Sequence, residues 1–233
     1  MIGCLIIAIL ACPLLIWYII QKSKKYDLKE LFLKTILSVL FVVLAVAATF
    51  ESDKITIFNV FVIIGLVLGL IGDILLDLKY IDIDRTKSYT YGGFAFFGVG
   101  HICYMSALIS EFYNGKIIYI IIAIILDIIL SSLIIILEKP LKLNYGKFKM
   151  ICIIYALCLF GTLSLSLLLS IENNFQIVAL NMFLLASSLF TISDLVLSGT
   201  YFGEGKERPI DFVLNYVTYY GAQYLIAFLL LVL

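Results

Sequence analysis

Charge is scarce in this sequence of 233 residues. Asp, Glu, Lys and Arg make up only 14% of it, whereas about a quarter is usual in soluble domains. The 16 basic and 16 acidic residues cancel, so nothing in the charge points to a nucleic acid partner. The first twenty residues lack a basic stretch and a small-residue cleavage site, so we expect a retained helix there and not a signal peptide. The low share of charged residues excludes an ordinary soluble domain.

The familiar motifs of metal and cofactor chemistry are missing as well. The sequence has no G-x-S-x-G elbow, P-loop, dinucleotide fingerprint or H-E-x-x-H. A metal site built from Asp73, Asp77, His101 and Asp194 is conceivable, but no ligand spacing supports it. We therefore expect no metal and no cofactor. An odd number of cysteines without C-x-x-C predicts small packing residues, with neither disulfides nor zinc: Cys4, Cys12, Cys103, Cys152 and Cys158.

Long apolar runs make up most of the chain. It is 64% hydrophobic, with a mean hydropathy of +1.15, and runs of about 20 residues match the thickness of a bilayer's hydrocarbon core. The sequence predicts an all-α, polytopic membrane protein: one domain over 1–233, a bundle of eight transmembrane helices. The expected spans are 2–20, 33–50, 56–76, 94–112, 117–137, 150–170, 175–197 and 211–232.

The positions of Lys and Arg predict the orientation of these spans. With eight spans, one set of alternating loops and span ends holds 14 of these residues, and the other holds only Lys54 and Lys116. Cytoplasmic loops are enriched in basic residues. Both termini are therefore predicted to be non-cytoplasmic, with the longer connections 77–93, 138–149 and 198–210 in the cytoplasm. For a bacterial protein, we expect a multi-pass protein of the cell (cytoplasmic) membrane.

Polar residues within the spans are the main functional signal. An ionisable group in a bilayer costs from about 2.5 kcal/mol upward, so such groups usually face a protein interior or a wet cavity. Asp73 and Asp77 lie one turn apart at the end of the third span, and Asp194 lies near the end of the seventh. The predicted topology brings them to the depth of further polar residues in the fourth and eighth spans: His101, Tyr104, Asn215, Tyr219, Tyr220 and Gln223.

Several of these residues also have a purely structural interpretation. Asp77 fits a solvated helix end, and the tyrosines of the eighth span fit an interfacial aromatic belt. His101, the only histidine, fits a buried side chain with its hydrogen bonds satisfied. Asp127, deeper in the fifth span, fits an interhelical hydrogen-bond partner of a serine or of Asn181.

The ends of the third and seventh spans resemble each other. One reads Gly72-Asp73, the other Ser193-Asp194, and they lie four spans apart. The small residue before each aspartate lets neighbouring helices approach closely, so Asp73 and Asp194 are the strongest functional candidates. The echo suggests two four-helix halves with a site between them, although so short a match also arises by chance.

Two aspartates sharing one buried site predict acid–base chemistry. Carboxylates close together in a membrane cannot both ionise cheaply, so one stays protonated beside an ionised partner. The protonated group donates a proton while the other activates water or stabilises positive charge. The sequence does not decide which of Asp73 and Asp194 is the acid.

Short motifs in four spans, taken in chain order, cover most of the sequence: Gly72-Asp73-x-x-Leu76, Phe94 with Gly98-x-x-His101-x-x-Tyr104, Ser193-Asp194, and Tyr219-Tyr220-x-x-Gln223. Together they resemble the YhhN family, which includes mammalian lysoplasmalogenases. The connection 77–93 is slightly longer and more charged than we expect for the family.

The resemblance implies hydrolysis of the vinyl ether bond of lysoplasmalogens to a fatty aldehyde and a glycerophospho-headgroup product. Its partners would be a lysophospholipid substrate and membrane lipid, and not nucleic acid. Asp73 and Asp194 would be catalytic. Substrate binding would fall to the other polar residues of the site: Asp77, His101, Tyr104, Asn215, Tyr219, Tyr220 and Gln223.

Three other classes of protein compete with this interpretation. A proton-coupled transporter of small molecules or lipids would also use membrane carboxylates and a histidine, and the weak repeat favours it. An intramembrane aspartyl protease is disfavoured, because Leu70-Ile71-Gly72-Asp73 is not Gly-x-Gly-Asp and no Pro-Ala-Leu occurs. A structural or receptor-like protein does not explain two aspartate-bearing helix ends at matching depth.

Overall fold

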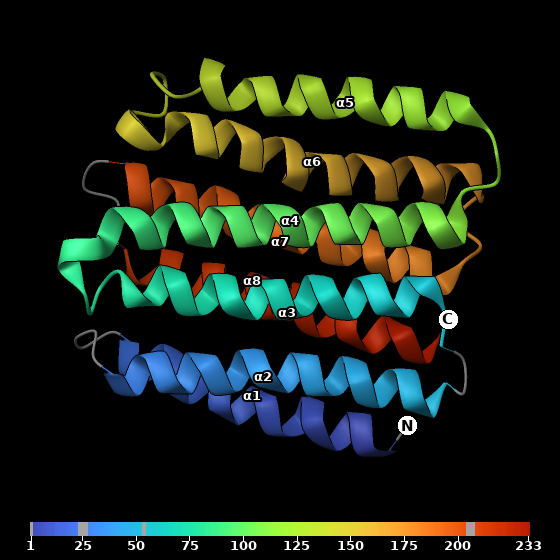
Figure 1. The fold of residues 1–233 in the computed structure, drawn as a ribbon, viewed down its shortest axis with the longest axis horizontal. Helices are drawn as coiled ribbons and strands as arrows, with labels where there is room; N and C mark the ends of the chain where they lie inside the picture. Colours follow the sequence, from blue (N-terminus) through green and yellow to red (C-terminus); the bar gives the residue numbers. More distant parts are fainter. Residues whose placement is uncertain (1, 23–27, 53–54, 204–207) are drawn as a thin grey trace.

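The chain folds into a bundle of antiparallel helices (Figure 1). The computed structural model describes residues 2–22, 28–52, 55–203 and 208–233. These residues contain eight α-helices and three short 3-10 helices but no β-strand, which confirms the predicted all-α class. The α-helices are α1 (Ile2–Lys22), α2 (Leu28–Glu51), α3 (Ile57–Leu78), α4 (Thr86–Phe112), α5 (Ile117–Ile136), α6 (Lys149–Glu172), α7 (Val178–Phe202) and α8 (Pro209–Phe228).

Successive helices reverse direction, so the two ends of the chain lie on the same side of the bundle (Figure 1). Helices α1 to α7 are each long and apolar enough to cross a membrane, by length and composition. Helix α8 does not meet that criterion in the described residues, because it carries Asn215, Gln223 and several tyrosines. The structure thus shows a multi-pass helical membrane protein. The eighth crossing and the non-cytoplasmic termini stay predictions.

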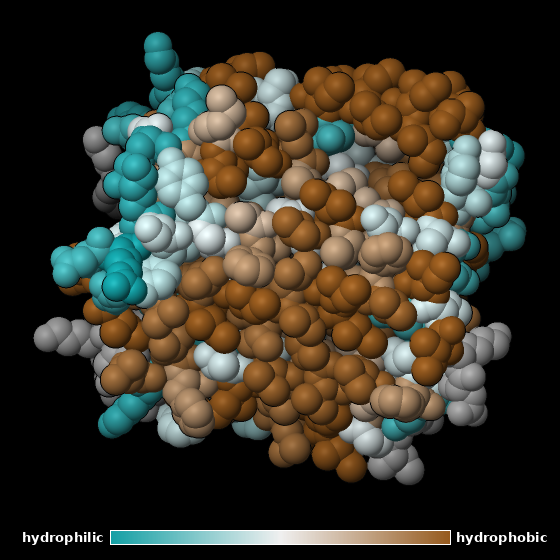
Figure 2. All heavy atoms as spheres, viewed as in Figure 1, coloured by the Kyte–Doolittle hydropathy of each residue, from teal (hydrophilic) through white to brown (hydrophobic). Residues whose placement is uncertain are grey.

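The surface matches this architecture. On the face shown in Figure 2, hydrophobic side chains form a broad middle zone, and hydrophilic ones gather toward the two ends of the helices. Helix α5, at the edge of the bundle in Figure 1, buries only Ala123 and Ser131, while Ile124 is 53% and Ile128 56% exposed. An apolar helix with so little buried surface is typical of a membrane span.

The connection predicted over 77–93 is shorter in the structure. Helix α3 ends at Leu78 and α4 begins at Thr86, after the short helix η1 (Ile83–Arg85). Hydropathy marks only the apolar part of α4, whereas its polar first turns are helical too: Thr90 Oγ1 donates to the Thr86 carbonyl, and the Tyr91 hydroxyl to that of Lys147. The prediction of a long loop was wrong for this reason.

Helix α3 contacts α4 more extensively than any other helix pair does in the described chain. A row of glycines on α3 makes this approach feasible. A Cβ on Gly65 would lie 2.3 Å from the Tyr104 ring, and one on Gly72 would lie 2.7 Å from the ring of Phe97. Both aromatic residues belong to α4, so α4 packs this closely only because these two positions of α3 have no side chain.

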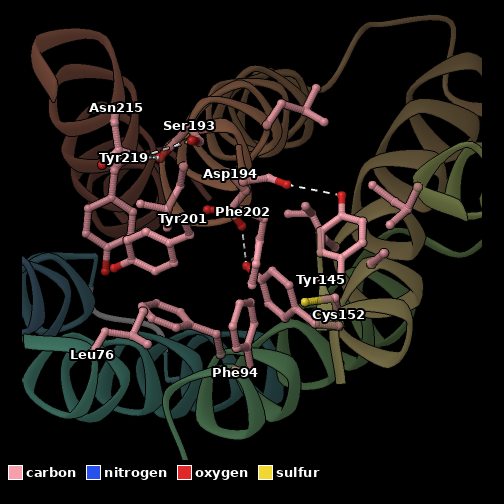
Figure 3. A pocket seen from close by; sticks show the side chains of 18 of the residues that line it. Leu76, Phe94, Tyr145, Cys152, Ser193, Asp194, Tyr201, Phe202, Asn215 and Tyr219 are labelled. Carbon is pink, nitrogen blue, oxygen red and sulfur yellow. Dashed lines mark hydrogen bonds between the residues drawn. The ribbon is translucent and has the colours of Figure 1, made fainter. Parts of the chain in front are cut away.

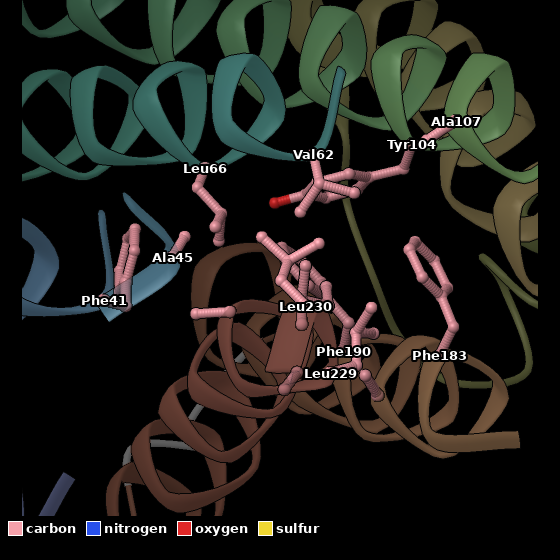
Figure 4. Close-up of a cluster of buried hydrophobic side chains, with 14 of the residues drawn as sticks. Phe41, Ala45, Val62, Leu66, Tyr104, Ala107, Phe183, Phe190, Leu229 and Leu230 are labelled. Atoms are coloured by element: carbon pink, nitrogen blue, oxygen red, sulfur yellow. The ribbon is translucent and has the colours of Figure 1, made fainter. Parts of the chain in front are cut away.

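A cluster of apolar side chains lies in the half of the bundle that holds the chain ends. Figure 4 shows Leu66 of α3, Phe183 of α7 and Leu230 facing one another, with the Tyr104 hydroxyl pointing into the cluster. All three apolar side chains are completely buried. Leu230 belongs to η3 (Leu229–Leu231), which follows α8. The other half of the bundle is built differently, because it contains the cavity described next.

Candidate functional site

A cavity opens among α3, α4, α6, α7 and α8, toward the end of the bundle where α3 and α7 finish (Figure 3). Its empty volume is about 930 Å³, including space open to the surroundings. Most of its surface is apolar, from residues such as Phe94 and Leu159. Leu195 lines the cavity and is also 51% exposed, so the cavity reaches the outer face of α7.

Asp73, near the end of α3, is the most heavily hydrogen-bonded carboxylate of the cavity. Ser38 Oγ of α2 and the Tyr219 hydroxyl of α8 each donate to its Oδ2 at 2.6 Å. Lys34 Nζ lies 3.2 Å from its Oδ1. Two neutral donors and one ammonium group therefore hold a residue that is only 3% exposed.

Lys34 is buried between two carboxylates. Its Nζ lies 3.0 Å from Asp77 Oδ1 as well as 3.2 Å from Asp73 Oδ1, and its side chain is 8% exposed. The Tyr220 hydroxyl donates to the Lys34 carbonyl and lies 3.4 Å from Ser38 Oγ. Helix α2 thus supplies the positive charge for the two acids of α3.

Asp194, on α7, has much sparser surroundings. It receives a short hydrogen bond from the Tyr155 hydroxyl of α6, its only hydrogen-bond partner within the described chain. The side chain is half-buried and lines the cavity (Figure 3). Beside it, Asn215 Nδ2 donates to Oγ and to the carbonyl of Ser193, both at 2.9 Å, and so ties α8 to α7.

A chain of hydrogen bonds leads from Asp73 toward the apolar half of the bundle. Tyr219, which donates to Asp73, accepts from Gln223 Nε2 at 3.1 Å. Gln223 Oε1 in turn accepts from the Tyr104 hydroxyl at 3.2 Å. A Cβ on Gly69 would lie only 2.8 Å from Gln223 Nε2, so the glycine row of α3 also makes room for this chain.

His101 lies beside the cavity and not on its lining. Its Nδ1 is 3.1 Å from Thr162 Oγ1, while its buried Nε2 has no partner among the described residues. The ring meets Tyr155 edge-on, with 5.9 Å between centroids, and Phe190 at 4.8 Å. His101 therefore packs against the tyrosine that holds Asp194.

The sequence-predicted site residues form two groups in the structure. Asp73, Asp194, Asn215 and Tyr219 line the cavity. The remaining candidates surround it, one layer behind the lining: Asp77, His101, Tyr104, Tyr220 and Gln223. The catalytic and binding roles assigned to both groups stay predictions.

Three residues that contact the two aspartates were not among the sequence candidates: Lys34, Ser38 and Tyr155. The lining also contains other polar residues that were not candidates, among them Tyr145, Ser198 and Tyr201. Lys34 was counted only as one of the basic residues at a membrane boundary. Its spacing from Ser38, one helical turn, places both on the same face of an otherwise apolar helix, and this pattern was a usable signal. Tyr155 lies in an ordinary apolar run, and nothing in the sequence connects it to Asp194.

Asp127 lies apart from the cavity, on α5. Ser131 of the same helix donates to its Oδ1 at 3.0 Å, so a serine is its partner as expected, though within one helix and not between two. Asn181 instead donates to the Phe175 carbonyl. Across the described residues, no three His, Cys, Asp or Glu side chains converge in a group that could hold a metal ion, and all five cysteines are free thiols.

The fold and the cavity define a polytopic helical membrane protein with two aspartates at one buried, largely apolar site. The sequence model of the YhhN family matches residues 30–230, which include every residue of the cavity. The chain therefore belongs to the YhhN family. No curated protein and no solved structure matches it significantly.

Proposed function

We propose that the protein is a membrane lipid hydrolase that cleaves the vinyl ether bond of lysoplasmalogens. The products are a fatty aldehyde and a glycerophospho-headgroup with a free glycerol hydroxyl. Membership of a family that includes lysoplasmalogenases supports this function. The observation that carries the proposal is the cavity itself, where Asp73 and Asp194 from two different helices line one mainly apolar space.

The two carboxyl groups suit the chemistry of a vinyl ether. A protonated carboxyl transfers its proton to the second carbon of the alkenyl chain, and the electron pair of the double bond forms the new C–H bond. This leaves an oxocarbenium ion, which a neighbouring carboxylate stabilises. Water adds to the first carbon and returns a proton to the carboxylate that donated one. The hemiacetal then collapses, its hydroxyl proton passing to the glycerol oxygen, to aldehyde and alcohol.

The apolar part of the cavity suits the hydrocarbon chain. Leu159 and Phe160 of α6, Leu195 and Leu197 of α7 and Ile134 of α5 line it, and Leu195 reaches the outer face. A chain that enters from the bilayer exchanges one apolar environment for another, so its transfer contributes little affinity. Recognition of the substrate then depends on the polar end of the cavity.

Transport, the main competitor, gains less support from the same geometry. A proton path would need polar groups from one end of the bundle to the other. The hydrogen-bond chain from Asp73 through Tyr219 and Gln223 stops at Tyr104. Beyond it lie Leu66, Phe183 and Leu230, all completely buried (Figure 4). This hydrogen-bond chain therefore ends at an apolar cluster and does not cross the bundle.

The proposal is tested with purified protein and three lysolipids that share headgroup and chain length. The first carries a 1-alkenyl chain, the second a saturated 1-alkyl ether and the third a 1-acyl ester. Only the alkenyl lipid has a carbon that can accept a proton to form an oxocarbenium ion, so we expect aldehyde from it alone. A parallel assay with chelator separates metal-independent from metal-dependent turnover.

The outcomes are distinct. Aldehyde from the alkenyl lipid, lost in Asp73→Asn and Asp194→Asn but retained in Asp127→Asn, supports the proposal. The last variant is a matched control, because Asp127 is also a carboxylate of a membrane helix but lies outside the cavity. No aldehyde from a folded wild type, or fatty acid from the ester instead, overturns it.

A further inference from the structure

We infer that Lys34 sets the protonation states of the two aspartates. It keeps Asp73 as the carboxylate and leaves Asp194 protonated, as the proton donor. This inference rests on the proposed function for its chemistry, but it concerns the protonation of two groups that are measurable without substrate. Lys34 acts through Asp73 and is a positioning residue.

The first argument is the distribution of positive charge. Among the described residues that line the cavity, Lys34 is the only Lys or Arg. Its ammonium group is already shared by Asp73, at 3.2 Å, and Asp77, at 3.0 Å. No basic side chain therefore lies beside Asp194 within the described cavity lining. An isolated carboxylate in a membrane protein is costly, so the acid without a cation is the one that stays protonated.

The second argument is the number of hydrogen-bond donors. Asp73 accepts from Ser38 and Tyr219, both at 2.6 Å, in addition to its contact with Lys34. An ionised carboxylate accepts several such bonds, whereas a protonated one must spend an oxygen as a donor. Asp194 has Tyr155 alone, and the space beside it belongs to the cavity. Its second oxygen is therefore free to carry a proton toward a substrate.

The third argument is the repulsion between the two acids. Both acids line the same cavity, most of whose surface is apolar. Once Asp73 is fixed as the anion by Lys34, ionisation of Asp194 is disfavoured by the like charge as well as by burial. Lys34 thus determines which of two similar residues is the acid.

These assignments give each group one task in the reaction. Asp194 gives its proton to the second alkenyl carbon and becomes a carboxylate. Asp73 stabilises the oxocarbenium ion by its charge and does not change protonation. Water attacks the first carbon, one of its protons returns to Asp194, and the hemiacetal collapses as described above. Between turnovers Lys34 stays in contact with Asp73 and offsets part of the negative charge of the site.

Infrared difference spectra of the protein in lipid, with its aspartates isotopically labelled at the side-chain carboxyl carbon, test this inference directly. The spectra distinguish protonated carboxyl groups from carboxylates. We expect Asp194→Asn to remove a protonated band and Asp73→Asn to remove a carboxylate band. The charged and titratable groups that face Asp73 are Lys34 from α2, Asp77 from α3, Tyr219 and Tyr220 from α8 and Asp194 from α7.

Variants at Lys34 then test its part in this arrangement. Lys34→Met should create one new protonated aspartate band, and Lys34→Met/Asp73→Asn should lack that band. Lys34→Arg keeps the charge and should restore the wild-type spectrum. Lys34→Met should also lower aldehyde release by about a hundredfold or more. Without Lys34, Asp73 is protonated like Asp194, so the general acid has no anionic partner.

The results that contradict the inference differ from those that contradict the proposed function. A protonated Asp73 or an ionised Asp194 in the wild type overturns it, even if aldehyde is released normally. So does a new band in Lys34→Met that persists without Asp73, because the proton would then lie on another acid. The expected spectra from a protein that releases no aldehyde would instead uphold the charge assignment and remove the proposed reaction.

Discussion

Asp73 and Asp194 sit in near-identical sequence contexts, each after a small residue in an apolar helix end, yet their surroundings differ sharply. Asp73 has an ammonium group and two hydroxyl donors within 3.2 Å. Asp194 has one hydroxyl donor, from Tyr155. One acid is almost fully buried and the other is half-buried beside the cavity. Position in the span therefore does not set the surroundings of a membrane carboxylate, which depend on the side chains that the neighbouring helices place beside it.

The largest expected effect comes from removing the proposed proton donor, Asp194. Asp194→Asn keeps the shape of the side chain but has no proton to donate to carbon, so aldehyde release should fall by about 10²–10⁴-fold. The fold should survive, because the substitution leaves a polar group for Tyr155 to bond. The measurement is turnover of purified variant and wild type, with Asp127→Asn as the control. Activity within tenfold of wild type would remove Asp194 from the mechanism.

The next effect is a loss of stability when Lys34, which contacts Asp73 but not Asp194, is replaced. Lys34→Met leaves Asp73 and Asp77 without their cation, whereas nothing comparable happens around Asp194. Removing one partner of a buried ion pair typically costs about 3–5 kcal/mol. The midpoint of thermal inactivation in detergent should therefore drop clearly. Lys149→Met is the matched control, because Lys149 also pairs with an acid, Glu138 at 2.6 Å, but is 45% exposed. Equal losses in both variants would contradict the account.

A smaller effect should come from the tyrosines that hold the two acids. Tyr155→Phe removes the one donor of Asp194, while Tyr219→Phe leaves Asp73 with Ser38 and Lys34. Asp194 becomes a carboxylate when it gives up its proton, and Tyr155 then donates to a charged group. Loss of such a hydrogen bond costs about 1.5–3 kcal/mol, so Tyr155→Phe should lower turnover about tenfold to a hundredfold. Tyr219→Phe should lower it less. The reverse order, measured as aldehyde release under the same conditions, would mean that Asp73 is the more sensitive group.

The smallest effect concerns the residues that precede the aspartates. A Cβ on Gly72 would lie 2.7 Å from the buried Phe97 ring, so Gly72→Ala should destabilise the protein by about 1–3 kcal/mol through overpacking. Ser193→Ala creates no clash and loses one hydrogen bond with Asn215, at a cost of about 1 kcal/mol. Thermal inactivation of both variants checks the order. An unchanged midpoint of thermal inactivation in Gly72→Ala would show that the Phe97 ring or α4 moves away at little cost.

The sequence was sufficient for the architecture because the bilayer imposes it. Apolar runs long enough to span the hydrocarbon core must be helical, and the eight expected helices all occur. Helix ends were less predictable: α4 starts at Thr86 and α7 continues to Phe202, where polar and aromatic residues extend the helix beyond the apolar run. Hydropathy indicates which part of a helix lies in the hydrocarbon core, but it does not indicate where the helix ends.

The same limit applies to the site. Asp73 and Asp194 were predictable because an acid within an apolar span is costly, and the structure places both on one cavity. Lys34 and Tyr155 were missed because a basic residue near a membrane boundary and a tyrosine in an apolar run are both ordinary. Their importance arises only from the packing of α2 against α3 and of α6 against α7, which no single-helix pattern contains.

The most direct test of the central claim is hydrolysis of an alkenyl lysolipid in heavy water, with the aldehyde reduced to an alcohol as it forms and analysed by mass spectrometry and NMR. Proton transfer from a carboxyl group to carbon predicts one deuterium on the second carbon of the product chain, in wild type but not in an Asp194→Asn reaction of equal duration. An aldehyde without deuterium at that carbon would contradict carbon protonation, and with it the proposed use of Asp73 and Asp194.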